Sequence, residues 1–303
     1  MVWGFCLYPA AAPLAQQARF PGFYGRSSAS MPSVAPTQTP MHSDIKGLID
    51  QGIIEKPELG EKYNVNDGNA DLVYGENRLD VYQNRNKIVL DWNTFDIGRD
   101  AETQFHQNGG SALNRIYDQD PSKIYGKLTA DGKIYLINQN GILFGPGSRI
   151  NVHSLTASSL KLKFEPEPIY DDDNIFIGWK WEDHFARIGG EEAVSNHGDI
   201  QADKGGAVFL IGPEVENAGT IDAAGGQVAL IAGNDVEMKL VDRTFPYVWV
   251  TRGEKGETLE EKGTAVNTET GRITADAGLA GMYGRIVNQE GYIRAITAIT
   301  NNG

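Results

Sequence analysis

The sequence predicts an all-β protein, a solenoid of the parallel β-helix type in which each coil takes about 20 residues. Two observations predict this fold. The first is a Gly-x-Ile-x-Ala pattern that occurs four times in the second half of the chain. The second is the texture of the chain from about Tyr63 onward, where short apolar alternations are broken by Gly, Asn and Asp. Such alternation is typical of many short strands.

The four copies of the pattern are spaced as the coils of a solenoid should be. Their glycines are Gly198, Gly219, Gly271 and Gly291, so the first pair lies 21 residues apart and the last pair 20. Isoleucine and alanine alternate with a polar residue, which places the apolar pair inside the coil and the polar residue in solvent. Glycine permits the positive backbone φ that a sharp bend needs. We therefore expect positive φ at these four corners.

Two segments do not fit the repeat. The second and third copies lie 52 residues apart, and we expect the excess at residues 235–262 to form a hairpin outside the solenoid. A second excursion of this kind is expected at residues 165–184. The recognisable coils reach Ala295, and no cap follows before Gly303. We therefore expect repeats that continue beyond this chain.

The N-terminal part differs in composition from the rest. The stretch from Val2 to Leu14 is apolar and rich in Ala and Pro, so we expect residues 1–18 to be the remnant of a secretory signal peptide. Residues 19–62 hold many Pro, Ser, Thr and Gln and are expected to form a low-complexity linker. One short helix, capped by Ser43, is expected within it. The β-helix domain should then span residues 63–303.

Composition and motifs limit the function classes. A net charge of −13 argues against a nucleic-acid partner, because phosphate recognition needs a basic surface. The single cysteine, Cys6, supports neither a disulfide framework nor a cysteine-ligated metal site. The five histidines show no paired metal spacing, and no phosphate-binding loop or Gly-x-Ser-x-Gly pattern occurs. We expect no cofactor, no metal and no enzymatic activity.

Three ordered motifs carry a family resemblance. They are Ile88-Val-Leu-Asp-Trp-Asn-Thr-Phe-Asp-Ile-Gly98, Ala112-Leu-Asn-Arg-Ile116 and Ile134-Tyr-Leu-Ile-Asn-Gln-Asn-Gly-Ile-Leu-Phe-Gly-Pro-Gly-Ser-Arg-Ile-Asn-Val152. With them the chain resembles the N-terminal secretion (TPS, haemagglutination activity) domain of two-partner-secretion exoproteins, the filamentous-haemagglutinin and high-molecular-weight adhesin family. One position departs from the family pattern: Gln139 stands where proline is usual, which gives the turn more conformational freedom.

The resemblance implies a fold and a route. The fold would be a right-handed parallel β-helix with N-terminal antiparallel capping strands and extra-helical hairpins. The domain would cross the periplasm of a Gram-negative bacterium unfolded, be recognised by the periplasmic domains of an outer-membrane β-barrel transporter, and fold outside. The protein would be secreted or lie at the cell surface. The passenger, which is the part of the exoprotein that this domain exports, would then contact glycans of host or neighbouring cells.

The candidate recognition residues lie in two of the motifs. The first group is Asn138, Gln139, Asn140, Gly141 and Ile142, and the second is Asn114, Arg115 and Ile116. A purely structural role is the alternative for both, because Asn and Gly are usual residues at solenoid corners.

Two other functions stay open. One is a carbohydrate-active β-helix enzyme, which would need convergent carboxylates from among Asp199, Asp203, Asp222 and Asp276. In the repeat, however, Asp222 is equivalent to Gln201, Thr274 and Arg294, which is typical of a solvated face. The other is a stand-alone adhesive module, whose contact residues would be Trp179, Trp181, Tyr247 and Trp249 on the excursions.

Overall fold

The protein is described from a computed structural model. The described residues are 34–66, 68–163, 167–170, 176–180, 183–186, 192–241, 245–250 and 263–296. For 163, 167–186 and 237–250, only the backbone of the strands is described. The expected signal peptide, residues 1–18, lies outside the described part. The compact unit that contains the described residues runs from Pro32 to Gly303.

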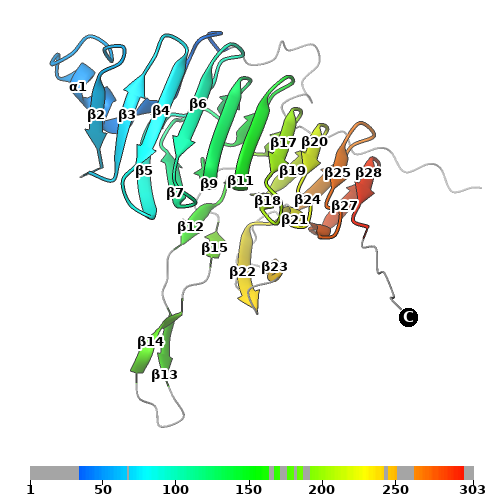
Figure 1. Cartoon of the computed structure of the whole chain (residues 1–303). Coiled ribbons are helices and arrows are strands. Elements are labelled where there is room, and N and C mark those ends of the chain that lie inside the picture. Colours follow the sequence, from blue (N-terminus) through cyan, green and yellow to red (C-terminus); the bar gives the residue numbers. More distant parts are fainter. Residues whose placement is uncertain are drawn as a thin grey trace, which may run out of the picture. The chain divides into compact units, whose positions relative to one another are not determined.

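Parallel strands stack along three rows, as a β-helix requires (Figure 1). The first row begins with antiparallel strands and contains β2 (Lys62–Val65), β3 (Ala70–Tyr74), β4 (Arg78–Gln83), β6 (Glu102–His106), β9 (Lys127–Ile137), β11 (Arg149–Ser158), β17 (Asp199–Ala202), β20 (Thr220–Asp222), β25 (Arg272–Thr274) and β28 (Tyr292–Arg294). The second row contains β1 (Met41–His42), β5 (Lys87–Thr94), β7 (Ser111–Ile116), the later halves of β9 and β11, β18 (Ala207–Gly212), β21 (Gln227–Ala232) and β26 (Leu279–Tyr283). The third contains β8 (Ser122–Ile124), β10 (Ile142–Phe144), β16 (Val194–Asn196), β19 (Glu214–Asn217), β24 (Thr264–Asn267) and β27 (Ile286–Gln289).

The strand register confirms the repeat and the parallel β-helix. Ile200 lies opposite Ile221, which lies opposite Ile273. All three are at most 1% exposed. Burying an isoleucine side chain stabilises a fold by about 1.5–3 kcal/mol, so this column is a main source of coil cohesion. The polar column beside it, Gln201, Asp222, Thr274 and Arg294, is also in register, as the repeat predicted.

The four glycines of the repeat are needed for a different reason from the one expected. None of them has positive φ; in the coils of the repeat that conformation falls at Gly205, Gly225 and Ala277 instead. A Cβ on Gly219 would lie 2.2 Å from the carbonyl oxygen of Gly198, which is far inside contact distance. A Cβ on Gly291 would lie equally close to the carbonyl oxygen of Gly271. The expectation of positive φ was wrong, and close stacking of successive corners selects glycine here.

An antiparallel cap precedes the first coil. Strands β2, β3 and β4 pair antiparallel, and β1 pairs antiparallel with β5. The helix expected near residue 43 is present as α1 (Ser43–Asp50), but its N-cap is His42 rather than Ser43. His42 is extended and its ring accepts a hydrogen bond from the Asp44 amide, whereas Ser43 is already helical. Ile45 is 1% exposed, so this part of the range expected as a linker packs onto the core.

The excursions form antiparallel pairs, as expected, but with an additional connection. Strand β13 (Glu167–Tyr170) pairs with β14 (Phe176–Lys180), and β22 (Asp235–Val241) pairs with β23 (Phe245–Val250). The sequence did not predict that β12 (Lys161–Lys163) and β15 (Asp183–Ala186) join β22 in the same antiparallel sheet. Val236 in β22 and Leu162 in β12 belong to a second buried cluster there.

Candidate recognition segment and its coil corner

Asn138 forms the corner between β9 and β10. Its side chain is fully buried. The carboxamide oxygen accepts a hydrogen bond from the amide of Asn140 (2.9 Å). The carboxamide nitrogen donates to the carbonyl oxygen of Asp120 (3.1 Å) and to Oγ of Ser122 (3.0 Å). Each polar atom of this side chain therefore holds a neighbouring part of the fold.

The rest of the candidate segment completes the same turn. Gln139 and Asn140 are half-buried, and Nδ2 of Asn140 donates to the carbonyl oxygen of Asp118 (2.7 Å). Gly141 has φ +101°, and a Cβ there would lie 2.9 Å from the carbonyl oxygen of Ala193. Ile142 is fully buried in β10. The turn is thus formed with Gln139 where proline is usual in the family.

The second candidate group lies one coil earlier. Asn114 is fully buried, and its Oδ1 accepts a hydrogen bond from Nε1 of Trp92 (2.9 Å). Its Nδ2 donates to the carbonyl oxygens of Ala112 and Tyr135. Ile116 is 7% exposed and belongs to the core. Asn114 therefore links two adjacent strands from inside the coil.

Arg115 is the exposed member of this group. Its Nε and a terminal guanidinium nitrogen reach the two carboxylate oxygens of Asp91 at 2.7 and 2.8 Å. Partial burial acts to raise the pKa of Asp91, but hydrogen bonding and the charge of Arg115 outweigh it, and the pKa lies below its ordinary value. Arg115 lies opposite Ile137, the residue before Asn138. The fold thus brings the two candidate groups onto neighbouring strands, where Asn114 links strands within the coils and Asn138 forms a turn.

Sequence reasoning missed Asp96 as a member of this corner. Asp96 is 7% exposed, and its Oδ1 accepts a hydrogen bond from the amide of Lys123 (2.7 Å). With Asn138 and Asn140, it fixes the segment 118–123 against the coil. Burial is the main cause that raises the pKa of Asp96. The sequence offered one signal that could have pointed to Asp96, which is its position inside the first motif, Ile88 to Gly98.

Replacing Asp96 with asparagine is expected to stabilise the domain at pH 7. The raised pKa means that the ionised carboxyl costs folding free energy, and this cost appears as the pH rises from about 3.8 through the folded-state pKa. An amide oxygen at the same place keeps the bond from Lys123. Thermal melts of both proteins should therefore coincide below about pH 3.8 and separate, with Asp96→Asn higher, near pH 7. A lower melting temperature of the variant at pH 7 would contradict this reading.

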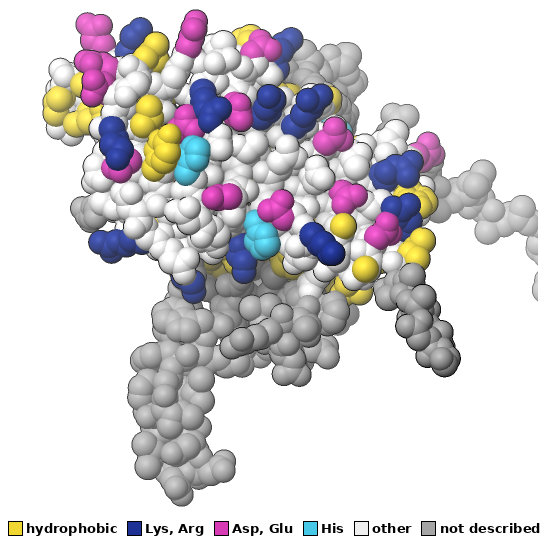
Figure 2. All heavy atoms as spheres, in the orientation of Figure 1, with side chains coloured by type: hydrophobic (Ala, Val, Ile, Leu, Met, Phe, Trp, Pro, Cys, Tyr) yellow, Lys and Arg dark blue, Asp and Glu magenta, His cyan; other side chains and the backbone are white. Residues whose placement is uncertain are grey.

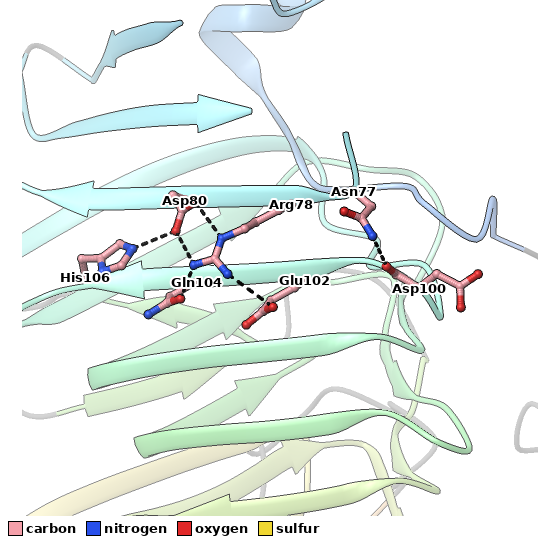
Figure 3. A network of polar contacts seen from close by, with 7 residues as sticks. All are labelled: Asn77, Arg78, Asp80, Asp100, Glu102, Gln104 and His106. Atoms are coloured by element: carbon pink, nitrogen blue, oxygen red, sulfur yellow. Dashed lines mark hydrogen bonds and ion pairs between the residues drawn. The ribbon is translucent and has the colours of Figure 1, made fainter. Parts of the chain in front are cut away.

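A polar network covers the outward face of β4 and β6 (Figure 3). Arg78 contacts Asp80 at 2.7 Å and Glu102 at 3.4 Å, and it also donates to Gln104. Nε2 of His106 lies 2.8 Å from Oδ1 of Asp80. The network members satisfy one another. Figure 2 shows charged side chains of both signs over this face, which fits a solvated surface.

The carboxylates proposed for an enzyme do not converge in the described part of the chain. Asp222 accepts a hydrogen bond from Oγ1 of Thr274, and Asp276 pairs with Arg294. Asp199 is exposed and lies opposite Thr220 in the next coil, rather than opposite another carboxylate. Among the described residues no group of three or more His, Cys, Asp or Glu could hold a metal ion. The same residues include no helix long and apolar enough to span a membrane.

The aromatic residues proposed for adhesion cannot be placed in the same way. Trp179 belongs to β14, and Tyr247 and Trp249 belong to β23, but their side chains lie outside what the structure describes. Trp181 lies outside the described residues altogether.

The fold and the corner at Asn138 together define the class of this protein. It is a parallel β-helix with an N-terminal cap, and its buried asparagines form hydrogen bonds within its own coils. This is the architecture of a β-helical secretion domain. The family model of the TPS secretion domain matches residues 63–302, and the chain belongs to this family. This confirms the resemblance carried by the three motifs. The protein is thus a secretion-targeting domain of the kind found in large exported exoproteins.

Similar proteins agree with this assignment. The chain is 35% identical over 181 residues to a heme/hemopexin-binding protein of Haemophilus influenzae (strain ATCC 51907 / DSM 11121 / KW20 / Rd), covering 59% of this chain and 19% of that protein. A second heme/hemopexin-binding protein of Haemophilus influenzae is 40% identical over 88 residues, 28% of this chain and 10% of that protein. The chain therefore matches only a small part of these relatives.

A solved structure shows the same fold. The HMW1 secretion domain from Haemophilus influenzae aligns with a TM-score of 0.55 and 24% identity, covering 76% of this chain and 55% of that one. At this identity the likeness concerns the fold alone, and it confirms the parallel β-helix.

Proposed function

We propose that this domain directs a larger exoprotein to a dedicated outer-membrane transporter, which recognises it in the periplasm before it folds. Membership of the TPS secretion domain family supports the export role. The exported protein would then lie outside a Gram-negative cell, secreted or at its surface. Nucleotide hydrolysis is not needed for release, because each coil that folds outside opposes backward movement of the chain.

The segment 138–142 is proposed to be read by the transporter in the unfolded chain. The observation that carries this proposal is the complete burial of Asn138 with both its carboxamide atoms engaged inside the fold. A partner cannot contact this side chain without opening the corner. In the unfolded chain the same stretch is β-prone with unpaired backbone groups, which suits strand addition to a periplasmic domain.

Arg115 and its neighbours are proposed to contribute less to recognition. The guanidinium is reachable in the folded protein, yet its donors are directed to Asp91. This pairing favours a role in folding for the Asn114, Arg115 and Ile116 group.

A binding experiment tests the proposal. The isolated periplasmic domains of the cognate transporter would be mixed with this chain, either folded or freshly diluted from denaturant. We expect complex formation with the unfolded chain and little with the folded one. Equal binding to both forms would contradict recognition before folding. A chain with Gln139→Ala and Asn140→Ala, residues that are half-exposed at the corner, should bind less in the unfolded form.

The ligand of the passenger is a second question, and the names of the relatives suggest which ligand to test first. Both are heme/hemopexin-binding proteins. We propose that the exoprotein carrying this domain be assayed for hemopexin binding before surface glycans. Binding of hemopexin by the full exoprotein would support this choice, and glycan binding alone would favour the adhesin alternative.

A further inference from the structure

His42 is a buried histidine at the junction between the N-terminal cap and the first coil. It is fully buried, and it is the last residue of β1 as well as the N-cap of α1. Its Nδ1 accepts a hydrogen bond from the amide of Asp44 (3.2 Å). Its Nε2 lies 2.7 Å from Oδ1 of Asn66, a carbonyl oxygen that only accepts. The ring is therefore neutral, with its proton on Nε2.

The same ring holds the cap against the second strand row. His42 lies opposite Trp92 in the antiparallel pairing of β1 with β5, and the two rings meet edge to face with centroids 5.2 Å apart. Asn66 continues the contact, because its Nδ2 reaches Oδ2 of Asp91 (3.2 Å). The link through Asn66 and Asp91 ends at Arg115, so the cap is connected to the Asn114, Arg115 and Ile116 group.

A second proton on this ring would have no acceptor at hydrogen-bond distance, because Oδ2 of Asp44 lies 3.9 Å from Nδ1 and already accepts a hydrogen bond from the amide of Asn66. Nδ1 would change from acceptor to donor while facing the donor amide of Asp44, and the N-cap bond of α1 would be lost. The charged groups nearby are Asp44, whose Oδ2 lies 3.9 Å from Nδ1, and Asp91. Arg115 largely neutralises Asp91, and the Tyr74 hydroxyl faces the backbone amide of His42. Burial, only partly offset by Asp44, Asn66 and Asp91, lowers the pKa of His42.

We propose that His42 is an acid-sensitive latch: its protonation releases β1 and α1 from β5, leaving the rest of the β-helix folded. The released cap uncovers the edge of β5 at Trp92 and Thr94, the two residues that β1 pairs with. An uncovered strand edge offers unpaired backbone groups for strand addition. The latch acts on the folded domain, so it is independent of recognition in the unfolded chain.

The direction in which pH changes the opening of the cap follows from the neutral state of the His42 ring in the closed form. Above about pH 6.5 both the closed and the open cap hold neutral histidine, and the opening equilibrium does not change with pH. Below that value the open cap binds the proton more readily. The open fraction should rise by up to about tenfold for each pH unit until the pH reaches the lowered pKa of the closed form.

Hydrogen exchange measured by mass spectrometry tests the latch on the folded chain. Labelling times at pH 7.5, 6.5 and 5.5 would be scaled to the intrinsic exchange rate. The protection of peptides covering residues 41–50 and 88–95 would then be compared with that of a peptide covering residues 200–232. We expect protection of the first two to fall between pH 6.5 and 5.5 while that of the third stays constant. Constant protection of 41–50 over this range would overturn the proposal.

Two variants separate the latch from general acid sensitivity. Asparagine is a good N-cap that does not titrate, so His42→Asn should remove the pH dependence at 41–50. The matched control His106→Gln, which removes a partly exposed histidine of the same sheet, should leave it unchanged. A closed His42→Asn cap that still opens in acid would overturn the proposal. If the His42→Asn cap is open at every pH, an NMR titration of His42 in the wild-type protein decides between the two readings. A measured pKa below 6.5 supports the latch, and a pKa of 6.5 or higher overturns it.

Discussion

Replacing Gly226 with alanine is expected to destabilise the domain by about 3 kcal/mol or more. Gly226 precedes β21, and a Cβ on it would lie 1.7 Å from the carbonyl oxygen of Gly206 in the preceding coil. Backbone cannot move aside as a flexible side chain can, so the two coils must separate and lose ladder hydrogen bonds. Such a loss corresponds to a fall of at least about 6 °C in melting temperature for a domain of this size. Thermal unfolding followed by circular dichroism measures it.

The matched control for Gly226→Ala is Gly47→Ala. Gly47 lies within α1, and the nearest atom to its added Cβ is Nε2 of Gln51 at 3.9 Å. Alanine is a better helix former than glycine by about 1 kcal/mol, so this variant should be slightly more stable than the wild type. Equal destabilisation by both substitutions would show that coil stacking is not what selects glycine at position 226.

Replacing Asn138 with alanine is expected to cost about 2–4 kcal/mol of stability and also to reduce export. The substitution leaves the carbonyl oxygen of Asp120, the hydroxyl of Ser122 and the amide of Asn140 without their partner. Each of these three hydrogen bonds contributes about 0.5–1.5 kcal/mol, and the hydroxyl of Ser122 is buried, so its loss lies at the upper end. Denaturant unfolding measures the first effect, and the amount of chain in the medium measures the second.

Asn196→Ala is the control that separates folding from recognition. Asn196 is also fully buried, its Oδ1 accepts from the amide of Gly198, and its Nδ2 donates to Oδ1 of Asn217 and to Thr220. It loses as many hydrogen bonds as Asn138, but it lies outside the segment 138–142. We expect similar losses of stability in the two variants and a larger loss of export for Asn138→Ala. Equal export would assign Asn138 to the fold alone.

The column of isoleucines and the position of the excursions could be predicted from the sequence, because both follow from local spacing. Ile200, Ile221 and Ile273 share a row once the period is known. The pairing of β15 with β22 could not be predicted, since it joins two excursions that are separated in sequence by six strands. The role of the repeat glycines could not be predicted either, because it depends on the distance between successive coils.

The candidate corner was located by its motif, but its chemistry was not. The sequence placed Asn138 and Gly141 in a turn, and the structure has them there. It did not indicate that Asn138 would be fully buried, since its partners Asp120 and Ser122 come from the preceding coil. His42 was hidden for the same reason, because its partner Asn66 is 24 residues away.

Export from living cells tests the central claim most directly. The chain would be produced in a Gram-negative host with and without its cognate two-partner transporter, and the medium, the periplasm and the cells assayed for it. We predict folded, protease-resistant domain in the medium only when the transporter is present, with the chain retained or degraded in its absence. Equal amounts in the medium under both conditions would contradict the assignment of this domain to transporter-dependent export.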